Sequence, residues 1–166
     1  MRDTTSRLFS QRTFAAAIEL IWREAALLDG KDYHTWLDLW DQAGYYVVPI
    51  DPAVTDFAAT LNYAYDDHSM RKMRVQRMTS GYSASANDAA RTVRTVSRFT
   101  SASNAADIVE VKSAQIIVAY KRGASTLFAA DLTHRICFAS GEPRIAQKVI
   151  RLIDSTEALS AIGFLL

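Results

Sequence analysis

Few of the side chains that most often bind metals or attack substrates occur in this sequence. Its three histidines, His34, His68 and His134, lie far apart, and Cys137 is the only cysteine. A non-haem iron site of the facial type needs two histidines and a carboxylate together, and a disulfide needs a second cysteine. We therefore expect no metal site and no internal disulfide. The histidines are interpreted as a helix-surface residue, a first-turn residue of a helix and a strand residue, in that order.

The short motifs of the commonest enzyme classes are also missing. The sequence contains no GxSxG elbow, no phosphate-binding loop and no dinucleotide fingerprint. Nucleophilic hydrolysis, nucleotide binding and hydride transfer are therefore not indicated.

The strongest polar feature is a basic segment between Arg71 and Arg98. It contains seven lysines and arginines but a single acid, Asp88. Aromatic residues do not alternate with these cations, and the net charge of the whole chain is only +1, so we expect no nucleic-acid binding. Arginine is favoured at protein interfaces because its planar guanidinium pairs with carboxylates. A subunit contact and a solvated basic face both remain open.

Length and hydropathy limit the organisation of the chain. The 166 residues suit one domain, 1–166, that buries a core without metals or disulfides. The sequence shows no signal-peptide pattern and no apolar run of the roughly 20 residues that cross a bilayer. We expect a cytoplasmic protein that does not enter a membrane.

Two helices are predicted before the first strand, and the segment 24–49 contains the end of the first helix, the whole second helix and that strand. Apolar residues recur at helical spacing up to Leu28, and Gly30 is expected to end that helix in a left-handed conformation. Asp32 can cap a second helix with one apolar side, formed by Tyr33, Trp36, Leu37 and Trp40. Gly44 then turns the chain into a strand closed by Pro49. Residues 1–10 show no periodicity, which predicts a loose arm or, as an alternative, a tail that clasps a partner.

The rest of the chain predicts a curved sheet. A short strand near 61–65 precedes a third helix, capped by Asp66 or Asp67 and ended by Gly81, and a polar loop covers 82–90. Long alternating segments follow at 91–101, 108–122, 127–138 and 145–153. Strands joined in chain order favour an antiparallel sheet that twists around a filler, here the first two helices. The apolar tail of 155–166 is expected to lie on the sheet or on another subunit.

The order of these elements resembles the small (β) subunits of Rieske-type aromatic-ring-hydroxylating dioxygenases. In that family the pattern EA-LLD-W-L-Y-VP opens the fold. Here it corresponds to Glu24, Ala25, Leu27, Leu28, Asp29, Trp36, Leu37, Leu39, Tyr46, Val48 and Pro49. A second pattern, DD-L-RV-RL, corresponds to Asp66, Asp67, Met70, Arg74, Val75, Arg77 and Met78. The resemblance covers nearly the whole chain, with departures at Ala90, Arg98 and Ala130, where serine, asparagine and glycine are usual.

The resemblance implies an α+β fold in which a cone-shaped curved antiparallel or mixed sheet encloses an N-terminal helical hairpin, as in nuclear-transport-factor-like and SnoaL-like proteins. It also implies a non-catalytic structural subunit of an oxygenase that degrades aromatic compounds. The expected partner is a large (α) subunit that carries a Rieske [2Fe–2S] cluster and a mononuclear iron, commonly with three subunits of each kind. The ferredoxin or reductase that delivers electrons would contact mainly the large subunit. No cofactor is expected in this chain, because one cysteine cannot hold a Rieske cluster.

The family pattern also selects four interface candidates from the basic segment: Arg74, Arg77, Arg91 and Arg94. Two other functions remain open, because cone-shaped domains also serve as small isomerases and dehydratases or as ligand-binding and oligomerising domains. An isomerase or dehydratase would place a proton-transfer group in an apolar pocket, where burial can raise the pKa of an aspartate. The candidates are Tyr33, Asp41, Tyr45, Tyr46 and His134. Alternatively, the tyrosines fill the core and Asp41 caps a turn.

Overall fold

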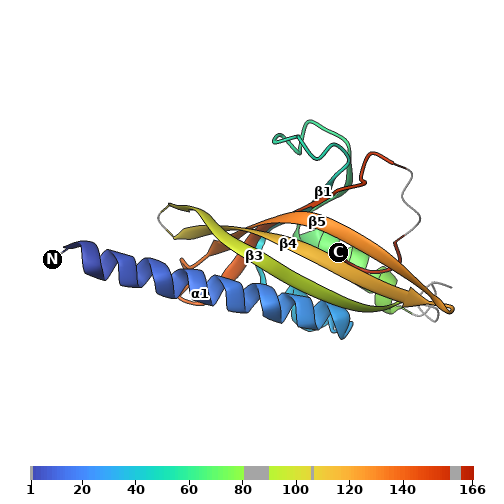
Figure 1. Ribbon diagram of the computed structural model, residues 1–166, viewed down its shortest axis with the longest axis horizontal. Coiled ribbons are helices and arrows are strands. Elements are labelled where there is room, and N and C mark those ends of the chain that lie inside the picture. Colours follow the sequence, from blue (N-terminus) through green and yellow to red (C-terminus); the bar gives the residue numbers. More distant parts are fainter. Residues whose placement is uncertain (1, 81–89, 106, 158–161) are drawn as a thin grey trace.

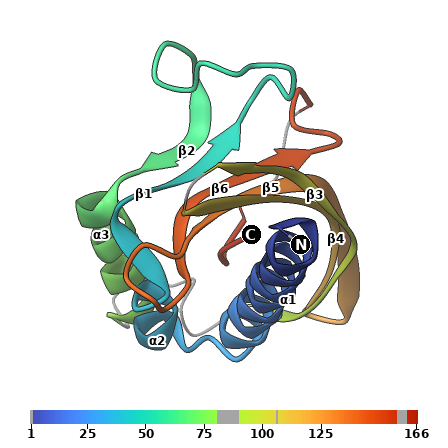
Figure 2. The same ribbon diagram turned by 90° about the vertical axis from the view of Figure 1, so that its left-hand side faces the viewer.

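A strongly curved six-stranded sheet wraps around a long helix in the computed structural model (Figures 1 and 2), which describes residues 2–80, 90–105, 107–157 and 162–166. The helices are α1 (Arg2–Asp29), α2 (Tyr33–Leu37) and α3 (His68–Thr79). The strands are β1 (Trp40–Pro49), β2 (Asn62–Asp66), β3 (Arg91–Ala105), β4 (Ile108–Lys121), β5 (Ala124–Cys137) and β6 (Arg144–Leu152). The predicted α+β architecture is confirmed.

The strand order is β2-β1-β6-β5-β4-β3. Strands β3 to β6 follow one another as antiparallel neighbours, as their chain order predicts. The last strand, β6, then lies parallel to β1, so the sheet is mixed. This pairing places the first strand, β1, beside the last strand, β6, in the interior of the sheet. Strands β2 and β3 form its two edges.

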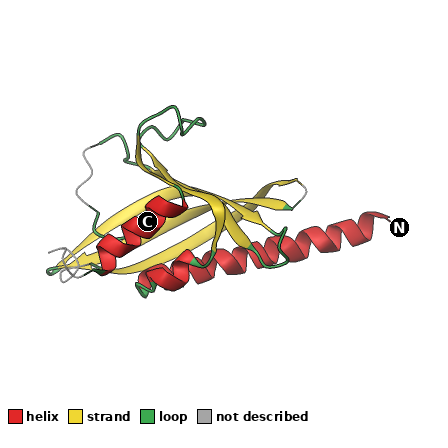
Figure 3. Cartoon of the chain, turned by 180° about the vertical axis from the view of Figure 1, so that it is seen from behind, coloured by secondary structure: helices red, strands yellow, loops and turns green. Residues whose placement is uncertain are grey.

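Helix α1 lies against the concave inner face of the sheet, as Figure 2 shows end on. Its buried side includes Ala17, Leu20, Ile21 and Leu28, which recur at helical spacing. The prediction of a loose arm at 1–10 is wrong, because α1 begins at Arg2 and its first turns project beyond the strands (Figures 1 and 3). No helix in the described ranges is long and apolar enough to cross a membrane.

The turn between α1 and α2 differs from the prediction in one residue. Lys31, with φ of 57°, adopts the left-handed conformation, whereas Gly30 does not. Gly30 still donates its N–H to the Ala26 carbonyl at 2.9 Å, so it continues the helical pattern. Asp32 caps α2 as predicted, because its carboxylate accepts the Thr35 N–H at 3.2 Å.

Strand β1 begins earlier than expected, at Trp40, which was predicted to lie on the second helix. Its pairing with β6 is irregular between Trp40 and Tyr45. Gly44 lies in this segment, where a Cβ atom would be only 2.8 Å from the Ile145 carbonyl oxygen. Only glycine therefore allows β1 and β6 to approach this closely. Trp40 is nevertheless buried, so its predicted place in the core is confirmed.

The remaining elements follow the predicted order closely. Asp67 rather than Asp66 caps α3, accepting the Met70 N–H at 2.9 Å. Strand β3 extends four residues past the predicted end at Ser101, and β5 begins three residues before Leu127. The polar loop predicted at 82–90 and the Gly81 helix end lie outside the described residues, except Ala90. Leu165 and Leu166 are buried against the inner face of this chain's own sheet.

Candidate functional site

A buried cluster of charged side chains lies where α1 meets the inner face of the sheet. Glu24 comes from α1, His134 from β5 and Lys148 from β6, and each is at most 1% exposed. His134 and Lys148 are directly opposed in the β5–β6 register, so both project towards the helix. Glu24 occupies the apolar stripe of α1 one turn from Leu20 and Leu28. We call these three residues and Trp36 the buried charge cluster.

Hydrogen bonds to both carboxylate oxygens of Glu24 organise the cluster. Oε1 accepts from Trp36 Nε1 at 3.0 Å and from Lys148 Nζ at 3.1 Å. Oε2 lies 3.0 Å from His134 Nε2. Lys148 Nζ also donates to the main-chain oxygen of Leu166 at 2.9 Å. One carboxylate therefore connects α1, α2, β5 and β6, and the lysine adds the C-terminal segment.

The cluster keeps Glu24 ionised. Burial, the largest influence, opposes the carboxylate charge. The Lys148 ammonium and the hydrogen bonds from His134 and Trp36 outweigh burial and lower the pKa of Glu24 from 4.5 to about 2. Burial also lowers the pKa of Lys148 and of His134, because each would carry an uncompensated part of its charge away from water. The arrangement is one ion pair with a neutral imidazole beside it.

The geometry around His134 explains why its imidazole is neutral. A neutral ring that donates Nε2–H to Glu24 leaves Nδ1 as an acceptor, and Nδ1 has no hydrogen-bond partner among the described residues. Protonation would create a buried N–H without an acceptor, which costs free energy. The ring therefore donates to Glu24 and is closed to solvent, which is poor geometry for a general base.

The free energy of unfolding is expected to decrease in two stages as the pH falls. The unfolded chain binds a proton at His134 near pH 6.5 and at Glu24 near pH 4.5, whereas the folded chain resists both because both pKa values are lowered. The free energy of unfolding should therefore decrease as pH falls below about 6.5, and further between about 4.5 and 2. Urea titrations from pH 8 to 3 measure this.

His134→Gln is the matched variant for the first stage. Glutamine can donate to Glu24 but does not titrate, so the slope between pH 6.5 and 5 should flatten. Constant stability of the wild type over that interval would contradict a neutral, buried His134.

The C-terminal segment closes the cone from the side of β1. Leu166 N donates to the Tyr46 hydroxyl at 3.1 Å, and the Leu165 oxygen accepts from Arg94 at 3.0 Å. Phe164 packs edge-on against Phe128, with ring centroids 5.4 Å apart. A cavity of about 250 Å³ remains between this segment and strands β1 and β2. Among the described residues of the tail, Ser155, Leu165 and Leu166 are buried, so the predicted burial on the sheet is confirmed for them, with contacts in the same chain.

The five residues proposed for proton transfer do not form one site. Tyr33 and Tyr46 are buried in the core, and burial raises the pKa of both hydroxyls. Tyr45 instead stacks on Tyr65, with centroids 4.9 Å apart. Asp41 accepts the Ala43 N–H at 2.8 Å, which is the turn-capping role. His134 is separated from these groups by its bond to Glu24, so the described geometry offers no convergent acid and base.

The four interface arginines occupy different environments. Arg94 is 7% exposed and binds Asp29 through Nε at 2.8 Å, while its own backbone N–H reaches the second oxygen of that carboxylate at 2.8 Å. Arg74 binds both oxygens of Asp66. Arg77 and Arg91 are exposed. Helix α3 and strand β3 lie at opposite edges of the sheet, so the basic segment is not one surface.

Arg71, from the same basic segment, has a structural role. It is fully buried, lies over the Trp40 ring at 4.3 Å, and donates to the carbonyls of Gly44, Asp66 and Asp41. Burial lowers its pKa to about 10, so it stays charged at neutral pH. Arg71 thereby satisfies the main-chain oxygens that the irregular start of β1 leaves free.

No metal site is formed among the described residues, since no three His, Cys, Asp or Glu side chains come together there. His34 is exposed on α2 and His68 begins α3, as their interpretations require. Cys137 is partly buried at the end of β5.

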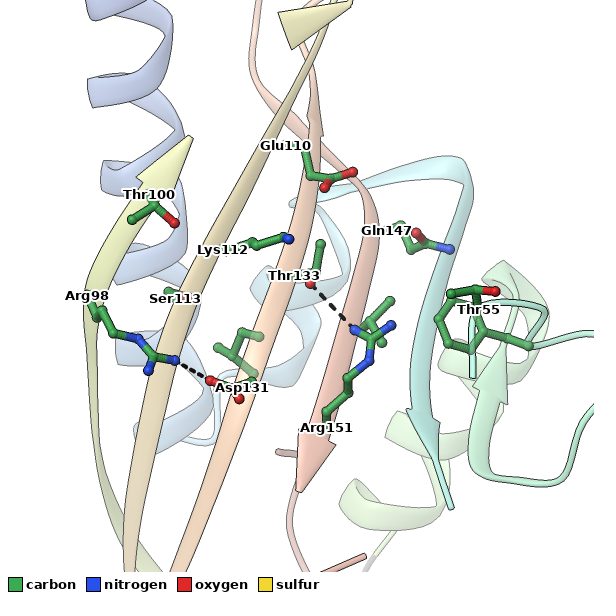
Figure 4. A pocket seen from close by; sticks show the side chains of 13 residues that line it. Thr55, Arg98, Thr100, Glu110, Lys112, Ser113, Asp131, Thr133, Gln147 and Arg151 are labelled. Atoms are coloured by element: carbon green, nitrogen blue, oxygen red, sulfur yellow. Dashed lines mark hydrogen bonds and ion pairs between the residues drawn. The ribbon is translucent and has the colours of Figure 1, made fainter. Parts of the chain in front are cut away.

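The outer face of the sheet holds an open basin of about 630 Å³ under the segment 51–60 (Figure 4). Arg98 pairs with Asp131 across it, and Arg151 donates to the Thr133 hydroxyl and to the Pro52 carbonyl. Arg98 has φ of 57° at a bulge in β3, where the resembled family usually has asparagine, a residue that tolerates this conformation better. The lining is of mixed charge, and two of its cations, Arg98 and Arg151, bind groups of the same chain.

Sequence reasoning missed the two charged residues that are buried together with His134. From the sequence, Glu24 is only part of the family pattern and Lys148 only one position in the alternating segment 145–153. The available signal was their position, because each lies on the apolar side of its element. A charged residue on an apolar face is buried and paired, or it is exposed by a distortion.

Comparison with known proteins identifies the family. Residues 23–157 match the family described as the ring-hydroxylating β subunit. The small oxygenase component of the p-cumate 2,3-dioxygenase system of Pseudomonas putida is 28% identical over 165 residues, covering 95% of this chain and 91% of that protein.

Two solved structures show the fold. The β subunit of benzoate 1,2-dioxygenase from Burkholderia mallei has a TM-score of 0.72 at 20% identity, covering 90% of this chain and 95% of that one. An NTF2-like protein with a cystatin-like fold from Novosphingobium aromaticivorans has a TM-score of 0.67 at 15% identity, covering 93% and 90%. The cone fold predicted from the sequence is confirmed, and the chain belongs to the β-subunit family of ring-hydroxylating oxygenases.

Proposed function

We propose that this chain is the structural, non-catalytic small subunit of an aromatic-ring-hydroxylating dioxygenase that acts in the degradation of aromatic compounds. The observation that carries the proposal is the family match over residues 23–157. The chain assembles with a large subunit that carries the Rieske [2Fe–2S] cluster and the mononuclear iron, with three subunits of each kind. The electron-delivering ferredoxin or reductase contacts mainly that large subunit.

The donor set of this chain supports a role without its own iron. Its single cysteine, Cys137, cannot supply the two thiolates of a Rieske cluster. A facial iron site needs two histidines, but His134 is bound to Glu24 while His34 and His68 lie on other elements. The iron chemistry is therefore assigned to the partner.

The closed interior supports a role without its own substrate site. The Glu24 carboxylate and the His134 imidazole could exchange a proton, and both are closed to solvent. Trp36, Lys148 and Leu166 surround them. Residues 1–166 act in this proposal as one cytoplasmic domain that stabilises the assembly.

The exposed arginines are the better candidates for subunit contacts. Arg77 and Arg91 are exposed and can reach another chain, whereas Arg74 and Arg94 already bind Asp66 and Asp29. We keep the interface role of all four arginines as a proposal, with the first two as direct contacts. The other two would act by holding α3 and β3 in place.

Co-expression with the large subunit of the same organism tests the proposal. The two chains should co-purify in equal amounts, with all iron accounted for by the large subunit. The small subunit purified alone should contain no stoichiometric iron and should neither hydroxylate aromatic rings nor dehydrate or isomerise hydroxylated ones. Stoichiometric iron in the isolated chain, or a turnover that His134→Gln abolishes, would overturn the proposal.

A further inference from the structure

The C-terminal segment, residues 162–166, lies inside the cone without belonging to the sheet. Figure 2 shows the C-terminal end of the chain within the curve of the strands. Leu165 and Leu166 are 3% and 5% exposed, yet neither lies in a helix or a strand. Among the described residues, the main-chain groups of this segment bond to side chains and not to another main chain. The segment therefore contacts the rest of the chain as a bound peptide would.

Three buried side chains of the sheet hold the main chain of this segment. The Tyr46 hydroxyl accepts the Leu166 N–H at 3.1 Å and donates to the Leu166 oxygen at 3.4 Å. Lys148 Nζ donates to the same oxygen at 2.9 Å, and Arg94 donates to the Leu165 oxygen at 3.0 Å. Tyr46, Lys148 and Arg94 are each at most 7% exposed. A further nitrogen of Arg94, Nη1, is buried and has no hydrogen-bond partner among the described residues. The inner face thus offers more donors than the segment uses.

Apolar contacts hold the side chains of the same segment, but they are incomplete. Phe164 packs edge-on against Phe128, and Leu165 and Leu166 join the core. On the side of β1 and β2, a cavity of about 250 Å³ remains between the segment and the strands, with Ala64 in its wall. Atoms that line a cavity lack partners on one side, so leaving this position costs the segment less than leaving a close-packed core.

We propose that this end of the cone is a binding site for short apolar peptides, with the C-terminal segment as its tethered occupant. The segment can leave, and a peptide of the same kind from outside can take its place. The ligand is an aromatic residue followed by two aliphatic ones, because a ring packs on Phe128 while main-chain groups meet the three donors. This site goes beyond the proposed function and does not rest on it.

Tethering explains why the site is closed in the intact chain. A segment attached through a short linker acts at an effective concentration on the order of millimolar. A peptide from outside must compete with it, so binding from outside requires weaker contacts of the tethered segment. The segment has no helix or strand bonds among the described residues, and parts of this kind open at a lower free energy than the whole domain unfolds.

Weakening the occupant in the full-length chain tests the inference. In Phe164→Ser/Leu165→Ser the segment loses two apolar side chains, while the donors of the site stay in place. The probe is a fluorescent peptide with the sequence of residues 161–166, AIGFLL, preceded by two lysines for solubility. In fluorescence anisotropy, this variant should bind the peptide at least about tenfold more tightly than the wild type, whose own segment competes.

Leu61→Ser/Ile153→Ser is the matched control, because it makes the same kind of change at side chains that are 81% and 76% exposed. It should bind the peptide as weakly as the wild type does. Adding Tyr46→Phe to the variant with the weakened segment removes the hydroxyl that accepts the Leu166 N–H, so its affinity for the peptide should fall about fivefold. Equal affinity of the wild type and the weakened variant, or a Tyr46→Phe change without effect, would overturn the inference.

Native-state hydrogen exchange of the wild type is a second test that needs no substitution. The Leu166 N–H, bonded to Tyr46, should exchange at least about tenfold faster than the N–H groups at the centre of β6, because the segment opens without global unfolding. Equal exchange rates would overturn the inference, since the segment would then leave the cone only when the whole chain unfolds. Assembly with the large subunit tests the proposed function separately, and its outcome does not depend on peptide binding.

Discussion

Replacing Lys148 by methionine is expected to lower the free energy of unfolding by about 3–5 kcal/mol. The ammonium is the full positive charge that meets Glu24 inside the core, with Nζ 3.1 Å from Oε1. Methionine fills nearly the same volume, so the loss comes from the unpaired carboxylate and not from a cavity. Urea unfolding followed by tryptophan fluorescence measures the change.

Lys112→Met is the matched control, because Lys112 is exposed on the outer face of β4, in the same sheet. Its effect should stay within about 0.5 kcal/mol. Adding Glu24→Gln to Lys148→Met removes the unpaired charge, so the double variant should lose less than the sum of the two single variants, by roughly 0.5–3 kcal/mol. Strict additivity would mean that the two side chains do not interact.

Trp36→Ala is expected to cost about 3–5 kcal/mol, because it empties the centre of the core. The indole is 1% exposed and packs edge-on against Trp40 and Tyr46, with centroids 5.4 Å and 6.0 Å away. It also donates to Glu24, so truncation removes one of the groups that keep this carboxylate ionised. Thermal and urea unfolding should report the same loss.

Two variants separate the contributions of packing and hydrogen bonding at Trp36. Trp36→Phe keeps most of the apolar volume but lacks the N–H, so about 1.5–3 kcal/mol of the loss should remain. Trp22→Ala removes an indole that is 54% exposed and donates to the Val96 carbonyl at 3.3 Å, so it should cost only about 1 kcal/mol. Equal effects of Trp36→Ala and Trp22→Ala would contradict the packing described for α2.

Residues of the family pattern connect the helices to the sheet through hydrogen bonds and ion pairs. Glu24 holds β5 and β6 through His134 and Lys148. Asp29 accepts the Arg94 backbone N–H and the Thr92 hydroxyl at the edge of β3, each at 2.8 Å. The bond to the Arg94 N–H occupies a main-chain donor of the edge strand β3, which would otherwise be free to pair with another strand. Glu24 and Asp29 in the pattern therefore make contacts between elements that are distant in the sequence, and they do not form a local motif.

Local sequence signals are enough to predict the elements and their order, because periodicity and capping act over a few residues. Alternation predicted the four long strands, and Asp32 marked the start of α2. The buried positions of Trp36 and Trp40 followed from helical spacing, even though Trp40 proved to begin a strand. Residues 1–10 were predicted wrongly because α1 continues through a segment without an apolar stripe.

Which charged residues meet depends on how the elements pack in three dimensions. Lys148 and Glu24 are separated by 124 positions, and their contact depends on β6 lying between β1 and β5, a pairing that no local pattern encodes. The same fold turns Arg94 inward to Asp29 and leaves Arg91, three residues earlier, on the outer face. Alternation along a strand tells which residues share a face, but the packing of α1 decides which face is buried.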